Sequence, residues 1–152
     1  MKNTTLCYIE KDGKYLMIHR TKKENDENRD KWIGLGGKFE EGESPHDCVR
    51  REIYEESGLI LDEPIYSGIV TFVSDVYETE YMHLFKCKEF HGELKADCSE
   101  GELEWIEKSA LLTLPIWEGD KIFLRLLESG APFFSLKLIY EGDRLISHSI
   151  ET

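Results

Sequence analysis

The chain has 152 residues, of which 40% are hydrophobic and 33% are charged, and this composition is typical of a single folded domain. The formal net charge of −12 argues against nucleic-acid polymers as partners, because these need a basic track, and no apolar run reaches the roughly 18 residues of a membrane span. The first 13 residues lack the apolar core of a signal peptide, and the four cysteines show no paired spacing. We therefore expect one cytoplasmic domain over residues 1–152 with reduced thiols.

The N-terminal part is predicted to begin with two strands. Residues 4–10 and 14–20 are rich in strand-forming side chains, and Lys-Asp-Gly at 11–13 supplies a turn between them. The polar stretch 21–31 has the composition of a mobile surface loop. Residues 32–44 contain four glycines, which favours a loop or an irregular strand.

A helix over residues 45–57 is indicated by signals at both ends. Ser44 is a good N-cap, Pro45 suits the first helical position, and Asp47 lies in the first turn, where the helix dipole favours negative charge. Gly58 is a natural left-handed stop.

The remaining elements mix strands with one more helix. Strands are predicted at 65–76, 81–90 and 102–106, and a closing hairpin at 133–140 and 144–150. A second helix is predicted over 119–129, with Ile122, Phe123, Leu126 and Leu127 facing inward. The order predicts an α/β or α+β fold with helices packed on a mixed sheet.

The first helix concentrates acidic side chains at the edge of its buried face. Glu52, Glu55 and Glu56 fall within an arc of about 100°, beside Val49 and Ile53. Like charges at this spacing destabilise a helix, and divalent cations such as Mg²⁺ neutralise them with octahedral oxygen coordination. The alternative, an acidic face that is simply solvated, stays open at this point.

The spacing of these residues resembles the signature of the Nudix (MutT-like) hydrolases. From Gly37 the chain reads five residues, Glu43, seven residues, Arg51-Glu52-Ile53, one residue, Glu55-Glu56, one residue and Gly58-Leu59, which matches every fixed position of that signature. The resemblance implies an α/β/α sandwich with a mixed sheet between helices. It also implies hydrolysis of a nucleoside diphosphate linked to a further group.

The resemblance also implies roles for individual residues. Glu52, Glu55 and Glu56 would bind Mg²⁺, with Mn²⁺ as an alternative ion, and the Gly36 carbonyl would join them. Glu100 would add a ligand or the base for the attacking water, with Glu102 as its competitor. The supporting residues would be Arg51, Glu43, Gly37 and Gly58.

Residues outside the signature resemble the oxidised-purine nucleoside triphosphate hydrolases, a branch of the family that acts on 8-oxo-dGTP. Trp117, three residues before Asp120, is predicted either to stack on a base or to anchor the second helix. Asp120 is predicted to read the base edge, protonated if it is buried. Ile33 departs from that branch, which often has a base-reading asparagine there. The candidate phosphate-binding residues are Lys38, Arg20 and Lys23.

Two other functions remain open from the sequence. Tyr77 lies 18 residues after Leu59, a spacing that resembles dinucleoside-polyphosphate hydrolases of the family. A non-catalytic nucleotide-sensing domain is the second alternative, although the intact set of Arg51 and the three helix glutamates argues against it. The expected partner is a small nucleotide, and the sequence makes no prediction of oligomeric state.

Overall fold

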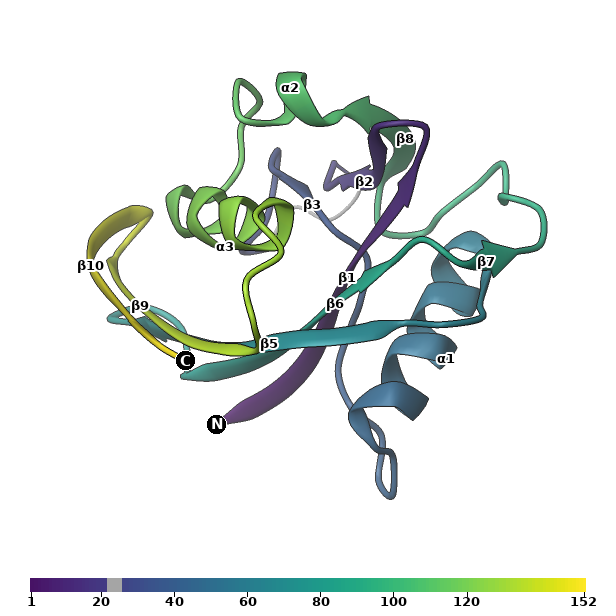
Figure 1. Ribbon diagram of the computed structural model, residues 1–152. Helices are drawn as coiled ribbons and strands as arrows, with labels where there is room; N and C mark the ends of the chain where they lie inside the picture. Colours follow the sequence, from purple (N-terminus) through teal and green to yellow (C-terminus); the bar gives the residue numbers. More distant parts are fainter. Residues whose placement is uncertain (22–25) are drawn as a thin grey trace.

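The structure is a computed structural model that describes residues 1–21 and 26–152 (Figure 1). The strands are β1 (Lys2–Lys11), β2 (Lys14–His19), β3 (Trp32–Ile33), β4 (Ile60–Leu61), β5 (Ile65–Ser74), β6 (Glu80–Cys87), β7 (Phe90–His91), β8 (Glu102–Glu107), β9 (Phe134–Glu141) and β10 (Arg144–Glu151). The helices are α1 (Pro45–Ser57), α2 (Lys108–Leu111) and α3 (Glu118–Glu128).

The main sheet is mixed and runs in the order β10-β9-β5-β6-β1-β2-β3, with β8 paired to β2. Strand β1 is parallel to β6, and β5 is parallel to β9, while β5 and β6 are antiparallel. Because β9 pairs directly with β5, the C-terminal hairpin extends the same sheet.

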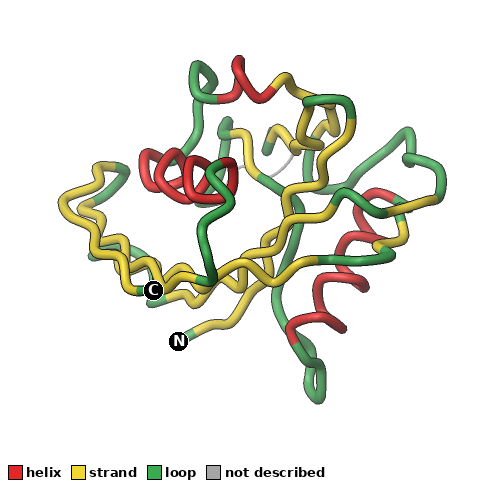
Figure 2. Tube along the Cα trace, in the orientation of Figure 1, coloured by secondary structure: helices red, strands yellow, loops and turns green. Residues whose placement is uncertain are grey.

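Helices α1 and α3 lie on opposite sides of strands β1, β5 and β6 (Figures 1 and 2). One core joins Val49 and Ile53 of α1 to the sheet residue Phe85. The other core joins Phe123 of α3 to Phe72 of β5. The α/β/α arrangement implied by the family resemblance is therefore confirmed.

Helix α1 begins and ends where its capping residues predict. The Ser44 side chain accepts a hydrogen bond from the backbone N–H of Asp47 at 3.1 Å, and the Asp47 side chain accepts one from the N–H of Ser44 at 3.0 Å. Gly58 adopts a φ of 82° at the C-terminal end, a conformation that favours glycine. This reciprocal cap fixes the direction of the helix that carries the acidic side chains.

Several helix and strand boundaries in the structure differ from the predicted ones. The strand predicted at 65–76 ends at Ser74, and α3 starts and ends one residue earlier than predicted. Phe123 and Leu127 are buried as predicted, whereas Ile122 and Leu126 pack only partly buried against the same core. Of the loop predicted at 21–31, residues 22–25 lie outside the described residues. No described helix has the length and apolarity to cross a membrane.

Candidate active site

The loop Gly36–Lys38 runs directly against strand β1. The backbone N–H of Thr5 donates to the Gly37 carbonyl at 2.8 Å. A Cβ atom on Gly36 would lie 1.9 Å from the Thr5 carbonyl oxygen, well inside any tolerable contact. Glycine at position 36 therefore lets the loop lie flat on the sheet next to α1.

Gly37 makes room for the first carboxylate of α1. A Cβ atom at this position would lie 2.4 Å from the carboxyl carbon of Glu52. The Glu52 side chain thus packs directly against the loop backbone, and burial raises its pKa.

Glu56 is the most deeply buried acid of α1, with 8% of its surface exposed. Its Oε1 atom accepts a hydrogen bond from the backbone N–H of Gly36 at 2.9 Å. Burial, followed by the nearby charge of Glu52, raises the pKa of Glu56 to about 8. A carboxyl group in this position either holds a proton or needs a cation beside it.

Arg51 is the cation that joins the acidic side chains. Its Nε and Nη2 atoms donate to the two oxygens of Glu43 at 2.6 and 2.9 Å. Its Nη1 atom donates to Glu52 at 2.8 Å and to Glu55 at 3.3 Å. The paired hydrogen bonds from Arg51 lower the pKa of Glu43 to about 2. One guanidinium is therefore shared through hydrogen bonds among three carboxylates, and Glu43 receives two of these bonds, including the shortest.

The distal acid that approaches this region is Glu100. Its Oε2 atom lies 3.1 Å from Nη2 of Arg20, and the charges of both groups influence the pKa of Glu56. Glu102, the sequence competitor, is exposed at the start of β8. Glu52, Glu55 and Glu56 are called the acidic edge of α1. The structure thus places Glu100, and with it Arg20, beside this acidic edge.

The donor set fits a divalent cation. Hard oxygen ligands are the kind that Mg²⁺ prefers, and Glu52 and Glu56 both have a raised pKa for which a cation would compensate. Among residues 1–21 and 26–152, no three acidic, histidine or cysteine side chains already converge as metal ligands. Arg51 holds Glu52 and Glu55, and Gly36 holds Glu56.

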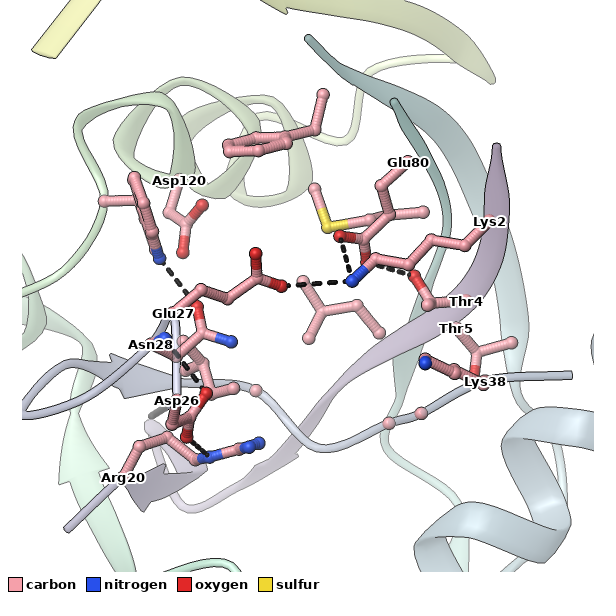
Figure 3. Close-up of a pocket in the computed structure, with 18 of the residues that line it drawn as sticks. Lys2, Thr4, Thr5, Arg20, Asp26, Glu27, Asn28, Lys38, Glu80 and Asp120 are labelled. Atoms are coloured by element: carbon pink, nitrogen blue, oxygen red, sulfur yellow. Dashed lines mark hydrogen bonds and ion pairs between the residues drawn. The ribbon is translucent and has the colours of Figure 1, made fainter. Parts of the chain in front are cut away.

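A pocket of about 220 Å³ opens beside the glycine loop (Figure 3). Gly36 and Lys38 belong to its lining, and so do Trp117 and Asp120 at the start of α3. Strands β1, β3, β5, β6 and β9 supply most of the remaining wall, together with Arg20 and residues 26–28. The pocket therefore joins residues that the sequence assigned to the phosphates with residues that it assigned to the base.

Trp117 is packed firmly into the wall of this pocket. Only 6% of its surface is exposed, and its Nε1–H donates to Oδ1 of Asn28 at 2.7 Å. Its ring meets Phe72 and Tyr140 edge-on, at centroid distances of 5.5 and 5.1 Å, and the Lys31 ammonium lies 4.4 Å from its centroid. The anchoring role is thus visible in the packing, and base stacking stays a prediction.

Asp120 is buried in the same wall, with 6% exposure. Burial, followed by the charge of Glu80, raises its pKa to about 8. Burial therefore favours the protonated form of this side chain, and its role in reading a base edge stays a prediction.

The remaining predicted residues have mixed placements. Arg20 and Lys38 line the pocket, but Arg20 is already paired with Asp26 at 2.6 Å. Ile33 also lines the pocket. Lys23 lies outside the described residues. Tyr77 packs against the α3-side core.

Sequence reasoning missed Lys2, Thr4 and Glu80, which also line the pocket. Thr4 and Glu80 form a hydrogen bond across 76 residues of sequence. The parallel pairing of β1 with β6 brings Thr4 and Glu80 together. No local sequence pattern predicts this pairing. The one available signal was an acid at the start of a predicted apolar strand.

The family model of the NUDIX domain matches residues 2–127. The chain belongs to the Nudix family. Membership makes it a pyrophosphohydrolase, in a family whose hydrolases generally use divalent metal ions.

Relatives of known sequence and structure agree with this assignment. YvcI, a Nudix hydrolase of Bacillus subtilis, is 30% identical over 134 residues, or 86% of this chain and 81% of that protein. The oxidized purine nucleoside triphosphate hydrolase of Mus musculus is 30% identical over 122 residues, or 79% of this chain and 77% of that protein. The crystal structure of a MutT protein from Bacillus halodurans has a TM-score of 0.89 at 28% identity, covering 99% of this chain and 98% of that one.

Proposed function

We propose that the protein hydrolyses a purine nucleoside triphosphate, in particular an oxidised one such as 8-oxo-dGTP, to the monophosphate and pyrophosphate. The observation that carries this proposal is the continuity between the acidic edge of α1 and the pocket. Gly36 bonds to Glu56 and also lines the pocket. A nucleotide whose base lies beside Trp117 and Asp120 would therefore extend its phosphates toward the carboxylates.

We assign the metal ligands to Glu52, Glu55, Glu56 and Glu100, together with the Gly36 carbonyl. A Mg²⁺ ion there would neutralise phosphate oxygens and lower the pKa of a bound water.

The protein residues have separate tasks in this proposal. Arg51 holds Glu52 and Glu55 in place through its Nη1 atom. A carboxylate of the set would remove the proton from the attacking water, because an ionised carboxylate can act as a general base. Arg20 and Lys38 place positively charged side chains at the phosphate end of the pocket. These assignments account for a site with several carboxylates and few free cations.

Asp120 supports a nucleobase, purines included, as the group held in this pocket. A protonated carboxyl group both donates and accepts a hydrogen bond, so it can pair with a base edge that presents both kinds of group. The similarity to the mouse enzyme, whose name states oxidised purine nucleoside triphosphates, points to the same class.

A substrate panel with Mg²⁺ tests this function. We expect hydrolysis of 8-oxo-dGTP and dGTP with release of pyrophosphate, at higher kcat/KM than for ADP-ribose, diadenosine polyphosphates or nucleotide sugars. Preference for a diadenosine polyphosphate would replace the proposed substrate. No turnover of any compound would favour a nucleotide-sensing domain.

A further inference from the structure

Glu80 lies on the pocket wall opposite Asp120, and the proposed mechanism gives it no task (Figure 3). Its side chain is only 13% exposed, which is unusual for a glutamate unless its charge is paired or used. Glu80 is the first residue of β6 and stands in register with Lys2 of β1. Two neighbouring strands of the sheet thus direct one acidic and one lysine side chain into the same pocket.

The Glu80 carboxylate is held in one orientation. Thr4 Oγ1 donates a hydrogen bond to its Oε2 atom at 2.6 Å, and Lys2 Nζ lies 3.6 Å from its Oε1 atom. The same ammonium lies closer, at 3.2 Å, to Oε1 of Glu27. One lysine therefore serves two carboxylates, and the more distant of the two, Glu80, keeps capacity to accept further hydrogen bonds.

Asp120 and Glu80 face each other closely enough to interact. The charge of Glu80 is the largest influence on the pKa of Asp120 after burial itself. Figure 3 shows both carboxyl groups directed into the pocket from opposite sides. Burial also raises the pKa of Glu80, but Thr4 and Lys2 favour its ionised form, so we take Glu80 as the acceptor of the pair and Asp120 as the neutral acid, which donates and accepts.

This pair of groups discriminates between purines. A guanine-type base presents a carbonyl oxygen and an amino group, with a ring N–H between them. An adenine-type base presents one amino group beside a bare ring nitrogen, which is an acceptor. A carboxylate facing that nitrogen would leave two acceptors opposed, and unpaired polar groups of this kind are costly in a buried site.

We propose that Glu80 is a specificity-determining residue, which accepts hydrogen bonds from the ring N–H and amino group of a guanine-type base, and that Lys2 and Thr4 are its positioning residues. This inference rests on the proposed function, because it takes the pocket as the base site of a nucleotide. It adds a second carboxyl group, from β6, to the contribution of Asp120.

Calorimetric binding of GMP and AMP tests the inference without requiring hydrolysis. We expect the wild type to bind GMP at least about 10-fold more tightly than AMP. Glu80→Gln should weaken GMP binding by about 10-fold and change AMP binding by less than about 3-fold. Glu78→Gln is the matched control, because Glu78 is nearby and 57% exposed, and it should leave both affinities unchanged.

Thr4→Val provides a second variant that keeps the charge of Glu80. Loss of the orienting hydroxyl should reduce the GMP to AMP affinity ratio by about 3-fold, and this variant decides the matter if Glu80→Gln does not fold. Equal losses for both nucleotides would show that Glu80 only ties β1 to β6, and would overturn the inference. So would equal affinities, or no binding of either nucleotide, in the wild type.

The outcomes separate this inference from the proposed function. A GMP preference that depends on Glu80, without hydrolysis of any triphosphate, would retain the specificity role and reject the proposed reaction. Hydrolysis of purine triphosphates with no base preference would retain the reaction and reject the role of Glu80.

Discussion

Glu56 at the acidic edge of α1 and Asp120 in the pocket are both buried carboxyl groups, but their neighbours differ. Burial raises the pKa of each to about 8. Glu56 lies beside Glu52 and accepts a backbone N–H from Gly36. Asp120 follows the buried ring of Trp117 in a wall that is largely aromatic.

The difference shows how each region neutralises its buried acid. Glu56 shares its surroundings with other carboxylates, so a divalent cation can replace its proton and satisfy several groups at once. Asp120 faces Glu80 from a buried, largely aromatic wall, so a proton on its carboxyl group is the simplest way to avoid a second buried charge there. Replacing the carboxyl group by an amide should therefore abolish activity at the first region, and at the second region it should remove the loss of stability that accompanies rising pH.

The largest expected effect is the loss of turnover in Glu56→Gln. The amide keeps the size of the side chain but removes a negatively charged oxygen from the proposed metal site. We expect kcat with Mg²⁺ to fall by at least about 100-fold, while the melting temperature stays the same or rises. Steady-state kinetics and thermal unfolding provide the two measurements.

Glu41→Gln is the control for this substitution, because Glu41 is an exposed acid in the preceding turn. It should keep wild-type kcat. Full activity in Glu56→Gln would rule out Glu56 as a metal ligand.

The next effect is a change in the pH dependence of stability in Asp120→Asn. The folded-state pKa of Asp120, about 8, exceeds the ordinary value of 3.8, so its stabilising contribution is complete below that ordinary value and is lost as pH rises through about 8. The wild type should therefore lose stability relative to the variant between pH 4 and 8, by up to about 1.4 kcal/mol per pH unit. Urea unfolding at several pH values measures this slope.

Asp12→Asn serves as the comparison, because Asp12 is exposed in a turn with φ 53°, which asparagine also tolerates. Its stability should follow that of the wild type across the pH range. A constant difference between the wild type and Asp120→Asn would mean that Asp120 is ionised in the folded protein.

The two regions also differ in how far the sequence reveals them. Helix α1 was predicted with its observed bounds, because its cap, its stop and its acidic edge all lie within Ser44–Gly58. The contact of Arg51 with Glu55 follows from the same helical spacing, whereas its bond to Glu43 reaches eight residues back, beyond the helix. Local rules of helix geometry therefore place the three glutamates of α1, but not the Gly36 backbone or Glu100.

The pocket depends on contacts that no local rule contains. Thr4 meets Glu80 only through the parallel register of β1 and β6. Trp117 is anchored by Asn28, 89 residues earlier in the chain. Asp120 could be chosen for its acidic side chain, but its partner Glu80 became visible only with the sheet topology.

Trp117→Phe separates packing from base stacking. Loss of the indole N–H bond to Asn28 and of part of the ring should lower the free energy of unfolding by about 1–2 kcal/mol. If the ring also stacks on a base, kcat/KM for a nucleoside triphosphate should fall more than that for inorganic tripolyphosphate. Trp105→Phe is the control, because Trp105 packs on the other core. Equal losses for both substrates would leave Trp117 with a packing role alone.

The smallest expected effect is at Glu43, where the sign of the pH dependence is opposite to that of Asp120. Arg51 lowers the pKa of Glu43 to about 2, so the stabilisation is present above the ordinary pKa of 4.5 and is lost as pH falls toward 2. Relative to Glu43→Gln, the wild type should lose less than about 1 kcal/mol between pH 4.5 and 2, because the ion pair is partly exposed. Urea unfolding at pH 6 and pH 3 provides the measurement, and a difference independent of pH would contradict the pairing. The same guanidinium also pairs with Glu52 and Glu55. A detectable loss of stability at low pH in the metal-free protein would therefore show that Arg51 pairs with an acid of this site before any metal binds.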